Sequence, residues 1–222
     1  MPMNSPYRTL PAWLVLVVAL GAVIAYHMPW HVHPAAAFSN NAFDLAEFAS
    51  LHPDVRNESP KLFTTLLLRL PLIFLGMVIT LTAVQLSDVR WQWIWIGVAL
   101  LIVLRLNPPR VFYPFGGGSI NDQQLGYLTI AGLIAIMFSW GAGRWLSGLY
   151  HPLMIVIVAV MLGVALNGYA RATDLLQNKL ALQIDAGGGL FLFVFLGLVL
   201  IGLVLWDGVY NWRRRQRAKA LP

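Results

Sequence analysis

One charged residue stands inside a long apolar run, and it is the strongest candidate for chemistry in the chain. Arg69 lies in the segment 61–86, which otherwise has the composition of a membrane-spanning helix. An arginine in hydrocarbon costs at least ~2.5 kcal/mol and often marks a solute or proton pathway. The structural alternatives are that Arg69 extends to the membrane surface or forms an ion pair, and we favour these over solute binding. The acidic residues expected within reach are Asp44, Glu47, Asp54 and Glu58.

Three histidines, His27, His31 and His33, follow the first apolar run. Imidazole binds zinc, copper and haem iron, and the spacing of His27 and His31 can place both on one helix face. Pro29 interrupts such a helix, however, and histidine is also common at a membrane interface. A metal or haem site is therefore the lesser hypothesis, and we expect no cofactor.

A segment rich in proline and glycine, 107–122, is expected to be an irregular loop. Its three glycines are not followed by Gly-Lys-Ser/Thr, so a nucleotide phosphate loop is not expected. One hypothesis is a pocket for a quinone, a lipid or a partner, and the favoured alternative is a packed lid loop. The pocket would be formed by Arg110, Phe112, Tyr113 and Phe115.

Small residues recur at every fourth position of the segment 123–143. Such a ridge lets a second helix approach closely. The ridge consists of Ala131, Ala135, Ser139 and Gly143, and Ala159 and Gly163 of the next apolar run are candidates to face it. The pattern predicts helix association, and leaves open whether the neighbour belongs to this chain or to another subunit.

The groups that the apolar runs lack also limit the function. No Asp or Glu lies away from the ends of these runs, whereas proton-coupled carriers need carboxylates in the membrane. There is no His-Glu-x-x-His pair and no Ser/His/Asp arrangement. The chain has no cysteine, which excludes disulfides and thiolate metal sites. We therefore expect a protein that is not an enzyme.

Composition places the chain in a membrane. Of its 222 residues 59% are hydrophobic and 11% are charged, whereas a soluble domain has about 25% charged residues. The net charge of +6 does not indicate nucleic-acid binding, because five basic residues lie in the last ten positions. A basic cluster beside an apolar run is a topology signal instead.

The expected fold is an all-α bundle of about six membrane spans in a single domain, 1–222. The spans are expected at 10–27, 61–86, 91–106, 123–143, 153–170 and 190–208. Outer loops would be 28–60, 107–122 and 171–189, with a cytoplasmic basic tail at 209–222. The alternative for residues 1–37 is a cleaved secretory signal, which the proline-rich segment before Ala35 disfavours.

Two signals orient this bundle with both termini in the cytoplasm. Lys and Arg divide eight inside to six outside, and the excess comes from the tail. Eight of nine tryptophans fall near the inner span ends, at the headgroup level that tryptophan prefers. They are Trp13, Trp91, Trp93, Trp95, Trp140, Trp145, Trp206 and Trp212.

Helix starts are predicted from capping residues. Asn41 with Asp44 predicts a short helix in the first outer loop, lying either on the membrane surface or a partner, or over its own bundle. Ser59 and Pro60 predict the start of the second span. Asn121 with Gln124 predicts the start of the fourth. A separate short helix is expected between Arg171 and Asp185.

These observations favour a non-enzymatic, structural or accessory subunit of a larger complex in the plasma (cell inner) membrane. Its partners would be the lipid bilayer and other membrane subunits, without nucleic acid. The first alternative is a permease component for a small solute or lipid, with Arg69 on the path. The second is a haem, copper or quinone subunit of an electron-transfer complex.

Overall fold

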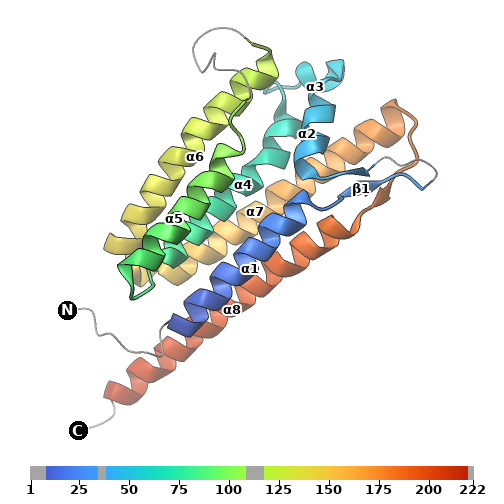
Figure 1. The fold of residues 1–222 in the computed structure, drawn as a ribbon. Coiled ribbons are helices and arrows are strands. Elements are labelled where there is room, and N and C mark those ends of the chain that lie inside the picture. Colours follow the sequence, from blue (N-terminus) through green and yellow to red (C-terminus); the bar gives the residue numbers. More distant parts are fainter. Residues whose placement is uncertain (1–8, 35–38, 109–117, 220–222) are drawn as a thin grey trace.

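The chain folds as a bundle of long helices, so the expected all-α class is confirmed (Figure 1). The computed structural model describes residues 9–34, 39–108 and 118–219. The long helices are α1 (Thr9–His27), α4 (Phe63–Ala83), α5 (Val89–Leu104), α6 (Ile120–Trp145), α7 (Tyr150–Asp174) and α8 (Gly188–Lys219). The short ones are α2 (Ala42–Ser50), α3 (Pro53–Arg56), the 3-10 turn η2 (Ser147–Leu149) and the π turn η3 (Leu175–Lys179).

Four helical segments within the described residues are long and apolar enough to cross a membrane. They are Phe63–Ala83, Ile120–Trp145, Tyr150–Lys179 and Gly188–Arg213. Two shorter apolar stretches, Ala12–His27 and Val89–Leu104, lie in α1 and α5. The chain is therefore a multi-pass membrane protein by helix length and composition.

The long helices alternate in direction along the chain. At one end of the bundle, which we call the lid end, the Tyr26 hydroxyl donates to the Leu68 carbonyl at 2.9 Å and joins the end of α1 to the start of α4. At the opposite, tail end, the hydroxyl oxygens of Thr82 and Tyr150 lie 3.4 Å apart and join the end of α4 to the start of α7. Helix α8 ends at the tail end, where α1 begins (Figure 1).

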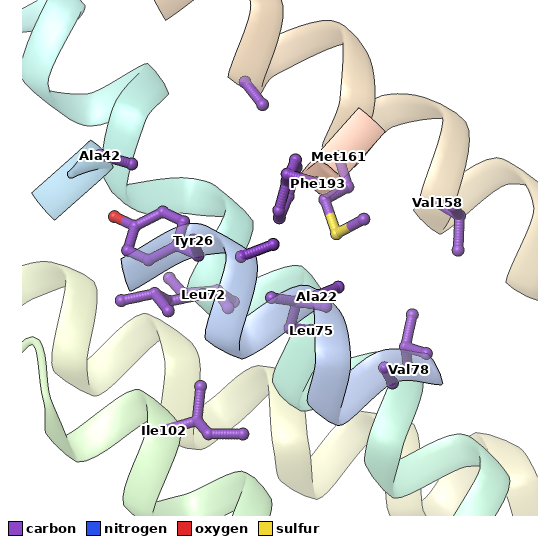
Figure 2. Packing of buried hydrophobic residues seen from close by; sticks show 14 of the residues in the cluster. Ala22, Tyr26, Ala42, Leu72, Leu75, Val78, Ile102, Val158, Met161 and Phe193 are labelled. Carbon is purple, nitrogen blue, oxygen red and sulfur yellow. The ribbon is translucent and has the colours of Figure 1, made fainter. Parts of the chain in front are cut away.

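Helix α4 is the centre of the bundle. It packs against α1, α2, α5, α6 and α7. In an 18-residue apolar stretch of α4, 78% is buried inside the protein, compared with 33–44% for the corresponding stretches of the other three long segments. Figure 2 shows Leu72, Leu75 and Val78 of α4 among side chains from the neighbouring helices. A substitution that alters the packing of α4 is therefore expected to disturb its contacts with most of the other helices.

Three two-residue strands tie the loops at the lid end together. The sheet order is β2 (Ser39–Asn40), β1 (His31–Val32), β3 (Asp185–Ala186), with antiparallel pairing throughout. The strands join the loop after α1 to the loop before α8. Sequence patterning did not predict them, because two residues are too few to show a period-2 alternation.

Glycine makes the junction between α1 and α8 possible. A side chain at Gly189 would place its first carbon 2.6 Å from the Met28 carbonyl oxygen, and one at Gly187 would collide with the Pro29 carbonyl. Gly187 and Gly189 instead donate backbone hydrogen bonds to the Trp30 and Pro29 carbonyls at 2.7 and 2.9 Å. The start of α8 is therefore fixed against the end of α1.

One predicted helix start and one predicted short helix were wrong. Helix α4 begins at Phe63 instead of at Ser59–Pro60, because the Glu58 carboxylate accepts the Thr64 amide at 2.8 Å and caps the helix there. The separate helix expected after Arg171 does not form. Helix α7 instead continues to Asp174 and ends in the π turn η3.

Candidate functional site

Arg69 is fully buried inside α4, two turns from the start of the helix at the lid end. Its guanidinium donates to three side-chain oxygens. Nη2 lies 2.7 Å from Glu47 Oε1 and 2.7 Å from Asn121 Oδ1, and Nη1 lies 2.6 Å from Gln124 Oε1. We call Arg69, Glu47, Asn121 and Gln124 the arginine clasp. It joins α2, α4 and α6.

The partners of Arg69 are also bonded to each other. Asn121 Nδ2 donates to the second carboxylate oxygen of Glu47 at 2.9 Å, so the Glu47 carboxylate accepts from two helices at once. Gln124 Nε2 donates to the Leu62 carbonyl at 2.9 Å, and the Thr65 hydroxyl lies 2.6 Å from Gln124 Oε1. Each partner of Arg69 is therefore also bonded to another group, so the clasp is a connected network and not three separate contacts.

Glu47 comes from α2, which lies over α4 at the lid end of the bundle (Figure 1). Its side chain is 38% exposed, whereas Arg69 beneath it is 0% exposed. The predicted cap is confirmed: the Asn41 side chain accepts the Asp44 amide at 2.9 Å. Asp44 is therefore used at the helix start, and Glu47 is the acidic partner of Arg69.

The apolar face of α2 settles its placement. Ala42, Phe43, Leu45 and Ala46 are buried within the bundle. The Arg105 guanidinium, just beyond α5, lies 4.2 Å from the centroid of the Phe43 ring, a cation–π contact. Of the two interpretations left open, α2 therefore covers its own bundle.

The predicted cap of α6 was wrong, and the error conceals the clasp. Ser119 is the N-cap of α6, with Asp122 as its capping-box partner. Asn121 and Gln124 fit the same spacing rule two residues later, but their side chains turn inward to Arg69. Sequence spacing cannot separate two overlapping capping patterns. The contacts of Asn121 and Gln124 with Arg69, more than fifty positions earlier in the chain, do separate them.

The structure separates the three histidines of the predicted metal site. His27 Nδ1 lies 2.9 Å from the carbonyl of Val23 in its own helix. His31 is fully buried, with Nε2 2.8 Å from the Thr173 hydroxyl and its ring centroid 4.7 Å from that of Tyr169. Burial lowers the pKa of His31 to about 4, because a charged imidazole would lose its hydration there.

Within residues 9–34, 39–108 and 118–219, no group of three His, Asp or Glu side chains is placed to hold a metal ion. The expected loop pocket of Arg110, Phe112, Tyr113 and Phe115 lies outside the described residues.

The small-residue ridge is only partly packed inside the chain. Ser139 and Gly143 of α6 are buried, with Gly143 against Val84, whereas Ala131 is exposed and Ala135 half-buried. Ala159 and Gly163 of α7 are exposed. Helix α4 packs against both α6 and α7, so α7 does not face the ridge in this chain. Gly132, which the pattern passed over, makes the closest approach, against Val103 of α5.

A second polar group lies at the tail end, and the sequence patterns did not indicate it. His151 Nε2 lies 2.8 Å from Asp207 Oδ2, which also accepts from Asn211 Nδ2 at 3.1 Å. These residues are more than fifty positions apart, so only the antiparallel packing of α7 and α8 reveals the pair.

The chemistry available to the clasp is that of a structural ion pair. Both terminal nitrogens of Arg69 are committed to oxygens of this chain, and the buried Nε has no hydrogen-bond partner among the described residues. Breaking a buried ion pair by removing one partner costs about 3–5 kcal/mol. No protein-family model, no curated protein and no solved structure matches the chain.

Proposed function

We propose that the protein is a non-catalytic structural subunit of a larger complex in the cell membrane. The observation that carries this proposal is the closed arginine clasp. The one arginine buried within α4 is fully enclosed and bonded to Glu47, Asn121 and Gln124. A permease would need this charge to be accessible to a passing solute. In the clasp the charge is instead bonded to Glu47 and holds α2 against the bundle.

The proposal includes six membrane crossings. Helices α4 and α6 both start at the lid end, because Arg69 near the start of α4 contacts Asn121 near the start of α6. Helix α5 lies between them in the chain and must return it to the same end. Its 16 residues span about 24 Å, somewhat less than the ~30 Å of a typical hydrocarbon core. Local thinning of the bilayer accommodates such a mismatch at modest cost.

The proposed orientation puts the tail end in the cytoplasm. The basic C-terminal residues belong to the last turns of α8, at that end. Tryptophans gather there: the rings of Trp13 and Trp91 lie 5.1 Å apart, and Trp145 and Trp212 are exposed. Tryptophan at this level anchors helices at the headgroups.

Because the chain has no native cysteine, single-cysteine labelling tests the orientation cleanly. Leu51→Cys lies on an exposed site at the lid end, and Ser87→Cys on an exposed site at the tail end. In intact cells an impermeant maleimide should label the first variant and label the second only after the membrane is broken. The reverse pattern would overturn the orientation, and labelling of both in intact cells would overturn the six crossings.

The subunit role is tested by purification through a C-terminal tag in a mild detergent, with mass spectrometry of the eluate. Stoichiometric membrane proteins should co-purify with the wild type. They should be lost from a variant with a disrupted clasp, Arg69→Met, and retained with the matched surface variant Arg171→Met. A chain that purifies alone, and migrates at the monomer mass in blue-native gels, would overturn the proposal.

A further inference from the structure

We propose that the tail end carries a binding site for one anionic phospholipid, in a groove between α7 and α8. The groove has a volume of about 220 Å³. Helix α7 contributes His151 and Ile155 to its wall. Helix α8 contributes Leu205, Gly208, Val209 and Trp212. This inference rests on the membrane embedding of the proposed function, and not on the complex.

The wall of the groove fits a hydrocarbon chain. Leu205, Val209 and Trp212 are about half exposed, so they offer apolar surface that the bundle itself does not cover. Gly208 brings α8 close to α7, because a side chain there would begin 3.3 Å from the His151 ring. The groove is therefore an apolar slot that runs along the helix pair toward the tail.

The polar groups beside the groove are already paired. His151 Nε2 lies 2.8 Å from Asp207 Oδ2, and Asn211 Nδ2 donates to the same oxygen at 3.1 Å. The one carboxylate at this end of α8 is thus bonded within the protein.

Charge complementarity selects the headgroup. Gly208, Trp212 and Arg215 follow one another at four- and three-residue steps in α8, so the same helix face continues from the groove into the basic tail. The tail holds Arg213, Arg214, Arg215, Arg217 and Lys219. A lipid with its acyl chain in the groove would have its phosphate near Trp212, where the basic sequence begins. Basic clusters beside a membrane span favour anionic over zwitterionic lipids.

The test uses full-length protein in nanodiscs that contain equal amounts of dioleoyl phosphatidylglycerol and dioleoyl phosphatidylcholine. Native mass spectrometry after release into mild detergent counts the lipids that stay bound. The wild type should retain one phosphatidylglycerol in clear preference to phosphatidylcholine. Equal retention of the two lipids, or retention of neither, would overturn the site.

Two pairs of variants locate the site. Val209→Trp fills the groove and should abolish retention, whereas Val160→Trp, at an exposed position of α7 outside the groove, should not. Arg215→Gln should lower the preference for phosphatidylglycerol about fivefold, the effect of one charge near the surface, whereas Arg144→Gln on α6 should leave it unchanged. Equal behaviour within either pair would contradict the assignment.

Folding and partner binding are measured separately from lipid retention. Each variant must elute like the wild type on size exclusion, and Leu205→Trp replaces Val209→Trp if the latter aggregates. If phosphatidylglycerol is retained by a chain that purifies without partners, the subunit proposal fails and the lipid site stands. If partners co-purify and lipid retention ignores the groove variants, the lipid site fails alone.

Discussion

Glu47 Oε1 and Arg69 Nη2 lie 2.7 Å apart and join the partly exposed lid helix α2 to the most buried helix of the bundle. The fully buried Arg69 charge depends on this partner, because desolvation of an isolated ion costs several kcal/mol. The amides of Asn121 and Gln124 complete the guanidinium's surroundings and bring α6 into the same contact. The clasp therefore makes the placement of α2 depend on three separate segments of the chain.

The amides of the clasp should matter individually. Gln124→Leu leaves Arg69 Nη1 without its acceptor, and Asn121→Leu leaves Nη2 with Glu47 as its remaining acceptor. Each loss of a bond to the charged guanidinium is expected to cost about 1.5–3 kcal/mol in the free energy of unfolding. Gln123→Leu, at the exposed position between them, should change it by less than about 0.5 kcal/mol. Thermal unfolding in a single detergent measures all three. Equal loss at all three positions would assign the effect to helix propensity instead of to the clasp.

The pH dependence of stability should contain a contribution from His31. Its pKa is about 4 in the folded protein and about 6.5 when the side chain is free, so the unfolded chain binds its proton more readily. Stability is therefore unaffected above about pH 6.5 and falls as pH drops toward 4, by up to about 1.4 kcal/mol per pH unit.

The control for His31 is His31→Gln, which keeps a polar group near Thr173 and cannot titrate. The other four histidines remain in this variant, so any difference between the two melting curves belongs to residue 31. The two curves should diverge in slope between pH 6.5 and 4. Parallel curves across that range would show that His31 is not buried in the neutral form.

The junction between α1 and α8 offers a matched pair of glycines. Gly187→Ala would drive a methyl group into the Pro29 backbone, and should cost about 1–3 kcal/mol or more. Gly188→Ala adds a methyl group where no atom lies within 4 Å, and should be neutral or slightly stabilising. The melting temperatures of the two variants decide the point. Equal melting temperatures would contradict the close approach of α1 and α8.

The contact between α5 and α6 should be sensitive to Gly132. An added methyl group there collides with the Val103 side chain and crowds Ile73, so Gly132→Ala is expected to cost about 1–3 kcal/mol. Gly163→Ala is the control, because Gly163 has open space around it. If Gly163 faces another subunit in the complex, its replacement by a large residue should reduce co-purification without lowering the melting temperature.

Composition and hydropathy were sufficient for the helical class and for the positions of the long helices, because hydrocarbon imposes a strong pattern on sequence. The cap of α2 was predictable from Asn41 and Asp44 alone. The cost of a charge in hydrocarbon pointed to an ion pair of Arg69, and Glu47 was among the four acidic residues expected within reach, but the amide partners were not identified. Asn121 and Gln124 carry a capping pattern that is locally valid, and only the parallel packing of α4 and α6 shows their actual use.

Long-range pairs were beyond sequence spacing for the same reason. His151 meets Asp207 only because α8 turns back along α7, and β1 meets β3 only because α7 returns the chain to the lid end. Ser59 and Pro60 form a good helix start, yet the Glu58 side chain captures the Thr64 amide and moves the start to Phe63. A capping rule that considers only Ser59 and Pro60 takes no account of Glu58, whose side chain bonds to an amide six positions later.

The most direct test of the clasp is a double-mutant cycle between Arg69→Met and Glu47→Met, followed by thermal unfolding in one detergent. Removal of Glu47 alone should cost about 3 kcal/mol or more, because it leaves the buried Arg69 charge without its counter-ion. Removal of Arg69 alone should cost less, because the Glu47 carboxylate is 38% exposed and still accepts from Asn121. The double variant should be less destabilised than the two losses added together, by at least about 1 kcal/mol. Additive losses, within about 0.5 kcal/mol, would show that Arg69 and Glu47 are not coupled and would contradict the clasp.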